Sequence, residues 1–276
     1  MSKKRISNMF VYVFLSVVSF ISVFPFYWMI VSATNRSVDI TRGRLIPGMH
    51  LLENFNTLNA QTHFGQAFWN SLRISVTATL LTIIVSSMAG YGFEVYRSKR
   101  KEIVFGLLLG SMMIPSATML VPVFLMLANI TSIAPAFGLN TVPAIITPGI
   151  ASVFLIFFFR QSTKMFAMEI LEAARIDGLS ELGMYFRIFV PIMRTTFAAA
   201  AIITFMGSWN SFLWPLIVVQ TTDMQTLPLL ISAVQDGHVI DFGLIMLTLV
   251  LSTIPIAVVF FVLQKHFVSG MMGMIK

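Results

Sequence analysis

Six long stretches of the chain contain no Asp, Glu, Lys or Arg, and they set the pattern from which the fold is predicted. Each is long enough to cross the roughly 30 Å hydrocarbon core of a bilayer as a helix, the fourth of them barely so. The stretches are residues 10–31, 74–93, 103–128, 142–159, 197–219 and 242–263.

Helices and closed barrels are the two structures that satisfy the backbone inside lipid, and the lengths of these stretches fit helices. The sequence therefore predicts an all-α, polytopic membrane protein: one domain over residues 1–276 with six transmembrane helices. The first stretch is too long for a signal peptide and no small-residue cleavage site closes it, so a retained helix is expected.

Basic residues are distributed unequally between the two sides that these helices define. If the N-terminus is cytoplasmic, most of the 18 Lys and Arg residues lie inside, and four lie outside. Those four are Arg36, Arg42, Arg44 and Arg73. Both termini are therefore expected in the cytoplasm.

Composition agrees with a membrane protein, since 57% of the 276 residues are hydrophobic and 11% are charged. The net charge of +7 could suggest nucleic acid, but its placement beside the apolar stretches favours a topology signal. Cysteine is absent, which excludes disulfides and thiolate sites.

The interior of the predicted helices argues against several functions. Ion-coupled carriers need ionisable side chains at membrane depth, and the six stretches supply none. The chain has no Gly-x-Ser-x-Gly motif, and no Gly-Lys pair with which to build a phosphate loop for ATP. The histidines are scattered over loops and helix ends without metal spacing, and solvated roles are expected for all of them: His50, His63, His238 and His266.

Two loops are large enough to hold a functional surface. The first external loop, residues 32–73, has a Gly/Pro-containing turn and then an amphipathic segment ending Phe68-Trp69-Asn70-Ser71, which is expected along the membrane interface. The second is the internal loop of residues 160–196.

The internal loop predicts two short helices at an angle. Residues 169–176 have high helix propensity, and Asp177-Gly178 provides a stop in which Gly adopts the left-handed conformation. A second helical run from Ser180 is expected to end at Pro191. Composition leaves two interpretations open: a surface that couples to a soluble partner, or an interfacial connector without one.

The run Glu-Ala-Ala-Arg-Ile-Asp-Gly at residues 172–178 resembles the conserved loop of binding-protein-dependent ABC importer permeases. Together with Gly-Ser-Trp-Asn-Ser-Phe-Leu-Trp-Pro-Leu at residues 207–216, Glu53-Asn54-Phe55 and Asn70-Ser71, it is similar to the carbohydrate branch, and to its smaller, maltose-type permease. Three positions depart from the usual pattern, which commonly has Pro, an acidic residue and Pro there: Ala167, Leu171 and Thr195.

The resemblance implies a multi-part importer in the bacterial cytoplasmic membrane. Its other parts would be a second homologous permease, two ATPase subunits that bind ATP and Mg²⁺, and an external sugar-binding protein. This chain would be non-catalytic, with no cofactor or metal of its own. The resemblance places the coupling residues in a groove of one ATPase and the tail of residues 264–276 near the ATPases; the coupling residues are Glu169, Glu172, Ala173, Ala174, Asp177 and Gly178.

Sugars are recognised by aromatic faces and by amides or hydroxyls, and six side chains could line such a pathway. They are Trp209, Asn210, Trp214, Gln220, Asn129 and Ser111. The alternative is that the two Trp residues are interface anchors or packing residues and that Asn210 bonds a neighbouring helix.

The external loop of residues 221–241 carries Asp223, Asp236 and Asp241 without a basic residue. It resembles the segment with which such permeases touch their binding protein, although Asp236-Gly237 could equally be a plain turn. The function predicted is import of an oligosaccharide by alternating access. The alternatives are a permease for another solute, such as a glycerol-phosphate-type ester, or an ion-coupled secondary carrier.

Overall fold

The computed structural model describes residues 3–235 and 241–273, and all of the regular structure in these two ranges is helical. The chain forms two compact units, each described by itself. The first unit comprises residues 1–65 and 230–254, and the second comprises residues 66–229 and 255–276. The all-α prediction is confirmed for the described residues.

The first unit contains α1 (Lys3–Ala33), α2 (Ser37–Thr41) and α3 (Leu51–Gln61), with the first part of α15 (Phe242–Gly273). Buried Asn54 of α3 ties this unit together, because its amide donates to the carbonyls of Ala33 (2.9 Å) and Asn35 (3.1 Å). The backbone of Gly243 lies directly against Asn35 and Asn54, where a side chain would not fit. The Asn of the Glu53-Asn54-Phe55 motif is therefore a structural residue.

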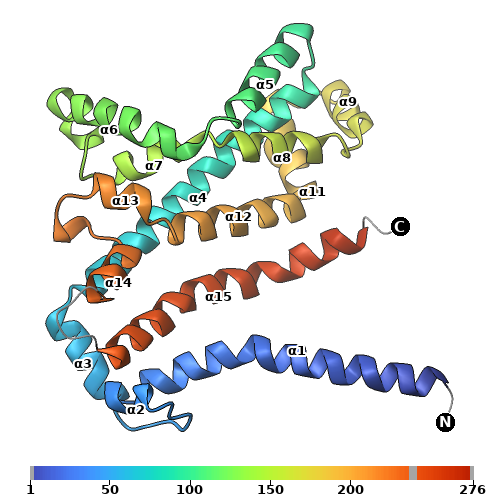
Figure 1. The fold of residues 1–276 in the computed structure, drawn as a ribbon. Coiled ribbons are helices and arrows are strands. Elements are labelled where there is room, and N and C mark those ends of the chain that lie inside the picture. The colour runs from blue at the N-terminus through green and yellow to red at the C-terminus, as the bar shows by residue number, and fades with distance from the viewer. Residues whose placement is uncertain (1–2, 236–240, 274–276) are drawn as a thin grey trace. The chain divides into compact units, whose positions relative to one another are not determined.

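The second unit is built around the 32-residue helix α4 (Phe64–Val95) (Figure 1). The remaining α-helices that belong to it wholly or in part are α5 (Lys99–Ser111), α6 (Ser116–Ile133), α7 (Val142–Ile150), α8 (Val153–Thr163), α9 (Met168–Ile176), α10 (Glu181–Met184), α11 (Val190–Ile192), α12 (Arg194–Trp209), α13 (Leu213–Val218) and α14 (Leu227–Gln235). Two short 3₁₀ helices, η1 (Pro135–Phe137) and η3 (Thr222–Met224), and the π-helix η2 (Tyr185–Phe189) complete it.

Four helices in the described ranges are long and apolar enough to span a membrane, and the number rises to six if each of two bent pairs forms one span. The four are Asn8–Ala33, Phe64–Val95, Ser116–Ile133 and Phe242–Gln264. The bent pairs are Val142–Ile150 with Val153–Thr163, at 44°, and Glu181–Ile192 with Arg194–Trp209, at 82°. Six spans in the predicted chain order are thus compatible with the structure.

Three of the six stretches do not form single unbroken helices. Residues 103–128 divide into α5 and α6, because Pro115 takes an extended conformation (φ −60°, ψ 131°) before α6 begins. Residues 142–159 break at Ser152, whose hydroxyl caps α8. Residues 197–219 break between Trp209 and Leu213.

One smaller prediction also needs correction. Phe68-Trp69-Asn70-Ser71 is not a separate interfacial segment, because α4 already begins at Phe64 and continues through it into the apolar stretch. The second helical run of the internal loop, which contains the π-helix η2, ends at Ile192, within one residue of the expected stop at Pro191.

Candidate functional site

Helix α9 carries the motif that the sequence singled out, and it has the predicted bounds to within one residue. It begins at Met168 and ends at Ile176, Asp177 is its C-cap, and Gly178 follows with φ +83°, in the left-handed region. The backbone N–H of Leu179 closes the turn on the carbonyl of Ala174 at 3.0 Å. The predicted helix and its glycine stop are therefore confirmed.

One face of α9 is packed against the membrane helices. Leu171 and Ala174 are 2% and 6% exposed and belong to a core cluster with Tyr91 of α4 and with Tyr185 and Phe189 of η2. Tyr185 is in turn fixed to α4 by a hydrogen bond of 2.6 Å between its hydroxyl and that of Ser87. The shared cluster packs the inner face of α9 against the last turns of α4 and against η2.

The opposite face of α9 is open. Five of the six predicted coupling residues are exposed, namely Glu169, Glu172, Ala173, Asp177 and Gly178, whereas Ala174 lies in the core cluster. Ile176 is also 87% exposed on this helix, although its side chain is large and apolar. An open face with a small residue and an exposed apolar one is suited to a protein partner.

A polar clasp holds α9 to the start of α10. The Arg175 guanidinium donates two hydrogen bonds to the Glu181 carboxylate, at 3.0 and 3.2 Å, and the Tyr96 hydroxyl donates to the same carboxylate. Glu181 raises the pKa of Arg175, while burial followed by this hydrogen bond raises the pKa of Tyr96. The clasp is therefore an ionic and hydrogen-bonded link at neutral pH.

A cavity of about 400 Å³, here named the charged cavity, lies beside α9. Its lining residues are Glu94, Val95, Arg97, Lys164, Met168, Leu171, Glu172 and Arg175. Five of the eight are ionisable, so this hollow is polar and connects the motif on α9 to the end of α4.

Glu94 also belongs to an ion network of Glu94, Arg97, Glu102 and Arg160, here named the buried ion network after its two buried members, Glu94 and Arg160; the side chains of Arg97 and Glu102 are about half exposed. The side chains of Glu94 and Arg160 are 3% and 6% exposed, and the Arg160 Nε donates to Glu94 at 3.2 Å. Arg160 further donates to Glu102, and Arg97 donates to Glu94.

Two neighbours place the Arg160 guanidinium. Its Cζ lies 4.0 Å from the ring centroid of Phe105 in α5. One turn before Glu94, Gly90 lets the backbone of α8 approach α4, because an added Cβ would be 2.8 Å from the Arg160 nitrogen. The buried ion network therefore joins α4, α5 and α8.

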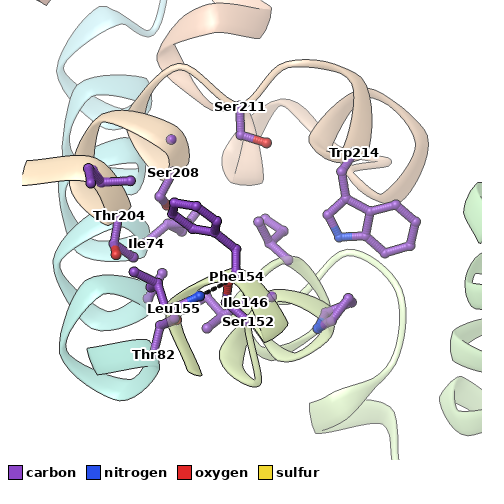
Figure 2. A pocket seen from close by; sticks show the side chains of 16 residues that line it. Ile74, Thr82, Ile146, Ser152, Phe154, Leu155, Thr204, Ser208, Ser211 and Trp214 are labelled. Atoms are coloured by element: carbon purple, nitrogen blue, oxygen red, sulfur yellow. Dashed lines mark hydrogen bonds between the residues drawn. The ribbon is translucent and has the colours of Figure 1, made fainter. Parts of the chain in front are cut away.

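A second cavity, here named the neutral cavity, has a volume of about 440 Å³ and lies among α4, α7, α8, α12 and α13 (Figure 2). None of its 16 lining residues is ionisable. Polar groups come from five hydroxyl side chains and one indole, which are those of Thr82, Ser152, Thr204, Ser208, Ser211 and Trp214.

Of the six predicted pathway residues, the structure places Trp214 alone in the lining of the neutral cavity. Its indole N–H donates to the Ala144 carbonyl at 3.2 Å. Trp209 is 2% exposed and stacks on Phe205, and the Asn210 amide donates to Met206 in its own helix. The structure does not gather the remaining three at this cavity: Gln220, Asn129 and Ser111 are exposed elsewhere.

The loop after α13 is held to the beginning of α4. The Asn70 amide donates to the carbonyls of Asp223 (2.7 Å) and Gln225 (3.1 Å), and the Ser71 hydroxyl accepts from the Leu227 N–H. Asn70 and Ser71 therefore anchor this loop to α4. In the first unit, Asp241 accepts from Ser37 at 2.7 Å and caps α15, while Asp236 lies outside the described residues.

A comparison with known protein families identifies the family of this chain. Residues 83–273, which include α9 and the linings of both cavities almost entirely, match the model of the binding-protein-dependent transport system inner membrane component. The chain belongs to this family.

The chain is similar to known permeases along nearly its whole length. The chain is 42% identical to the lactose transport system permease protein LacG of Rhizobium radiobacter, over 99% of this chain and 98% of that protein. It is 32% identical to the arabinooligosaccharides transport system permease protein AraQ of Halalkalibacterium halodurans, over 92% and 91%. The resemblance to carbohydrate-type importer permeases is confirmed.

The fold also matches a solved structure. A chain of the bacterial ABC transporter involved in the import of the acidic polysaccharide alginate superposes with a TM-score of 0.84 at 17% identity, covering 97% of this chain and 99% of the other. At that identity the likeness concerns the fold of the permease.

Sequence reasoning missed three of the residues that stand out in the structure. Ile176 was inside the motif, and its large apolar side chain beside a glycine stop was the available signal. Glu94 and Arg160 directly follow the uncharged stretches at residues 74–93 and 142–159. A search for ionisable residues within those stretches therefore excluded both.

The histidines show no sign of a metal site in the parts of the chain that can be examined. His50 contacts Glu53 at 2.7 Å and His63 is exposed. No group of three or more potential ligands is present among the described residues. His238 and the side chain of His266 lie outside the described residues.

Proposed function

We propose that this permease is the membrane subunit of an ATP-driven importer that passes an oligosaccharide from an external binding protein to the cytoplasm. Both termini and α9 lie on the cytoplasmic side, and α9 docks on a separate ATPase chain. A second, homologous permease completes the pathway. This chain hydrolyses nothing and holds no cofactor; ATP and Mg²⁺ are bound by the ATPases.

The observation that carries the proposal is the two-sided construction of α9. Its inner face is fixed to α4 through Leu171 and Ala174, and its outer face presents Glu172, Ala173 and Ile176. A partner that moves the outer face must therefore move α4 with it. An interfacial connector without a partner has no need of a small, open face on a rigidly packed helix.

Sugar as the cargo is supported by the lactose and arabinooligosaccharide permeases among the relatives. Membership in a binding-protein-dependent family favours this mechanism over an ion-coupled carrier. The uncharged lining of the neutral cavity favours it as well, because an ion-coupled carrier needs an ionisable group at such a place.

The test compares Ala173→Leu with wild type and with Ala136→Leu, which adds the same bulk at an exposed site outside the motif. Each form is purified from the native membrane in mild detergent, and the co-purifying chains are identified. We expect wild type and Ala136→Leu to bring down an ATPase and a second permease, and Ala173→Leu to lose most of the ATPase while keeping the second permease. Isolation of the wild-type chain alone would contradict the proposal.

Transport itself is measured on the complete system in proteoliposomes with internal ATP. The panel contains lactose, arabinotriose, sn-glycerol 3-phosphate and an alginate trisaccharide, each with its uptake compared in the presence of ATP and of a non-hydrolysable analogue. Uptake driven by an ion gradient without ATP would favour a carrier instead.

A further inference from the structure

The neutral cavity has the size and lining of a small-molecule site. Its volume of about 440 Å³ lies within the roughly 300–1,000 Å³ typical of such sites. Apolar and aromatic groups form most of the wall, and a few hydroxyls interrupt it, which is the usual composition of a ligand pocket.

An aromatic ring stands among the hydroxyl groups. Figure 2 shows the Phe154 ring at the centre of the view, between Ser208 on one side and Ser152 and Leu155 on the other. Phe154 is the second residue of α8 and is 46% exposed, so its face is available to a ligand. The C–H face of a sugar ring packs on such an aromatic surface.

Some of the hydroxyls already have partners and others are free to serve a ligand. The Thr204 hydroxyl donates to the Ala200 carbonyl at 2.7 Å, and the Ser152 hydroxyl accepts from the Leu155 N–H at 3.4 Å. Within the described part of the chain, the side chains of Ser208 and Ser211 make no hydrogen bond. Two half-buried hydroxyls beside an aromatic ring are the groups that would recognise sugar hydroxyls.

We propose that the neutral cavity is a subsite for an uncharged sugar unit during transport, with Phe154 as the stacking surface and Ser208 and Ser211 as hydrogen-bonding groups. The inference rests on the proposed function and extends it by assigning this subunit its own contact with the cargo. It also restricts the cargo. A carboxylate or phosphate in this cavity would find no counter-charge, and an unpaired charge in a poorly hydrated site is costly.

Gly207 offers a direct way to fill the cavity. It lines the wall near the end of α12, and an added Cβ would meet no atom within 4 Å. Gly207→Leu therefore places its side chain in open space without an initial clash, and leucine is the better helix former. Gly106→Leu is the matched control, since Gly106 is also helical and unobstructed but lies outside the lining.

With the complete transporter in proteoliposomes, we expect Gly207→Leu to lower ATP-driven uptake of lactose or arabinotriose at least tenfold, and Gly106→Leu to leave it within twofold. Gel filtration checks that both variants assemble. If wild type takes up a neutral sugar and Gly207→Leu takes it up equally well, the subsite is overturned and the proposed function stands. Absence of ATP-driven sugar uptake in wild type would overturn the proposed function itself.

A second measurement is independent of uptake rates. The natural chain contains no cysteine, so Ser208→Cys introduces a single thiol, with Ser132→Cys on the exposed face of α6 as the control. We expect a small maleimide to label Ser208→Cys, and saturating neutral sugar to slow that labelling at least threefold without affecting Ser132→Cys. A cavity filled by lipid or by the second permease would leave Ser208→Cys unlabelled, or labelled at a rate that sugar does not change, and either result would overturn the proposal. So would ATP-driven uptake of sn-glycerol 3-phosphate or the alginate trisaccharide.

Discussion

The two cavities of the second unit differ little in volume, about 440 and 400 Å³, yet their linings have opposite chemistry. The neutral cavity has no ionisable residue among its 16 lining residues, whereas five of the eight residues of the charged cavity are ionisable. Both include residues of α4, from Ile74 to Thr82 in the first and from Glu94 onward in the second.

Under the proposed function, the difference assigns two tasks to one helix. A wall that releases its cargo must hold it weakly, which suits hydroxyls and an aromatic ring. A joint that carries force between helices must not slip, which suits paired charges that are buried together, such as Glu94 and Arg160.

Removing one charge of the buried ion network is expected to have the largest effect. Arg160→Ala removes the buried partner of Glu94 and leaves it with Arg97, whose side chain is about half exposed, so a loss of up to about 3–5 kcal/mol is expected. The measurement is the yield and thermal unfolding midpoint of the assembled complex in detergent. Glu94→Leu combined with Arg160→Met removes both buried charges and is expected to recover most of the loss; a double variant as unstable as Arg160→Ala would show that the pair is not the source.

Adding a charge to the neutral cavity is the reverse experiment. Ser208→Asp introduces a carboxylate where the lining supplies no cation, and burying an unpaired charge is costly. Uptake of neutral sugar is expected to fall at least tenfold. Ser208→Asn, similar in size and uncharged, is expected to retain most uptake. Equal uptake by the two variants would mean that neutrality of this wall is unimportant.

The neighbouring alanines of the motif should respond differently to the same substitution. Ala174→Leu overpacks the cluster with Tyr91, Tyr185 and Phe189 and is expected to destabilise the permease chain by about 1–3 kcal/mol. Ala173→Leu on the open face is expected to change the stability of the permease chain by less than about 0.5 kcal/mol. Thermal unfolding of the two permease variants, each purified free of the ATPase, gives the comparison, and equal losses would contradict the two-sided description of α9.

The smallest effect is expected at the turn after α9. Gly178 has φ +83°, so Gly178→Ala places a Cβ in the left-handed region at a cost of roughly 1–2 kcal/mol before relaxation. Gly106→Ala, in the regular helix α5, should instead be neutral or stabilising by up to about 1 kcal/mol. Opposite shifts of the unfolding midpoint are the expected result; shifts of the same sign would remove the conformational argument for this glycine.

Much of the architecture could be predicted because it depends on local patterns. The uncharged stretches gave α1 and α15 as single helices, and propensity with a glycine stop gave α9 almost to the residue. The break at Pro115 was harder to predict, because a proline in a membrane helix either bends it or divides it according to what packs beside it; Pro148, by contrast, lies inside α7, and the chain breaks after Ile150. The sequence therefore shows where a helix can bend or break, but not which of the two happens.

The candidate sites could be predicted only where they are local. The exposed face of α9 is contained within nine residues, and the motif identified it. The contact between Glu94 and Arg160 joins residues 66 positions apart, and the neutral cavity assembles wall segments from five helices. Single-sequence patterns hold no information on such pairings, which is why one of six proposed pathway residues lines the cavity.

The continuity of α4 has a mechanical consequence. At 1.5 Å per residue its 32 residues form a rod about 48 Å long, without an internal proline, and Thr82 and Glu94 are about 18 Å apart along it. A tilt of about 10° pivoting at the Glu94 end would displace the Thr82 wall sideways by about 3 Å, comparable to the width of a water molecule. If the proposed ATPase moves α9, an unbroken α4 would carry that displacement to the wall of the neutral cavity without a relay of rearranging side chains.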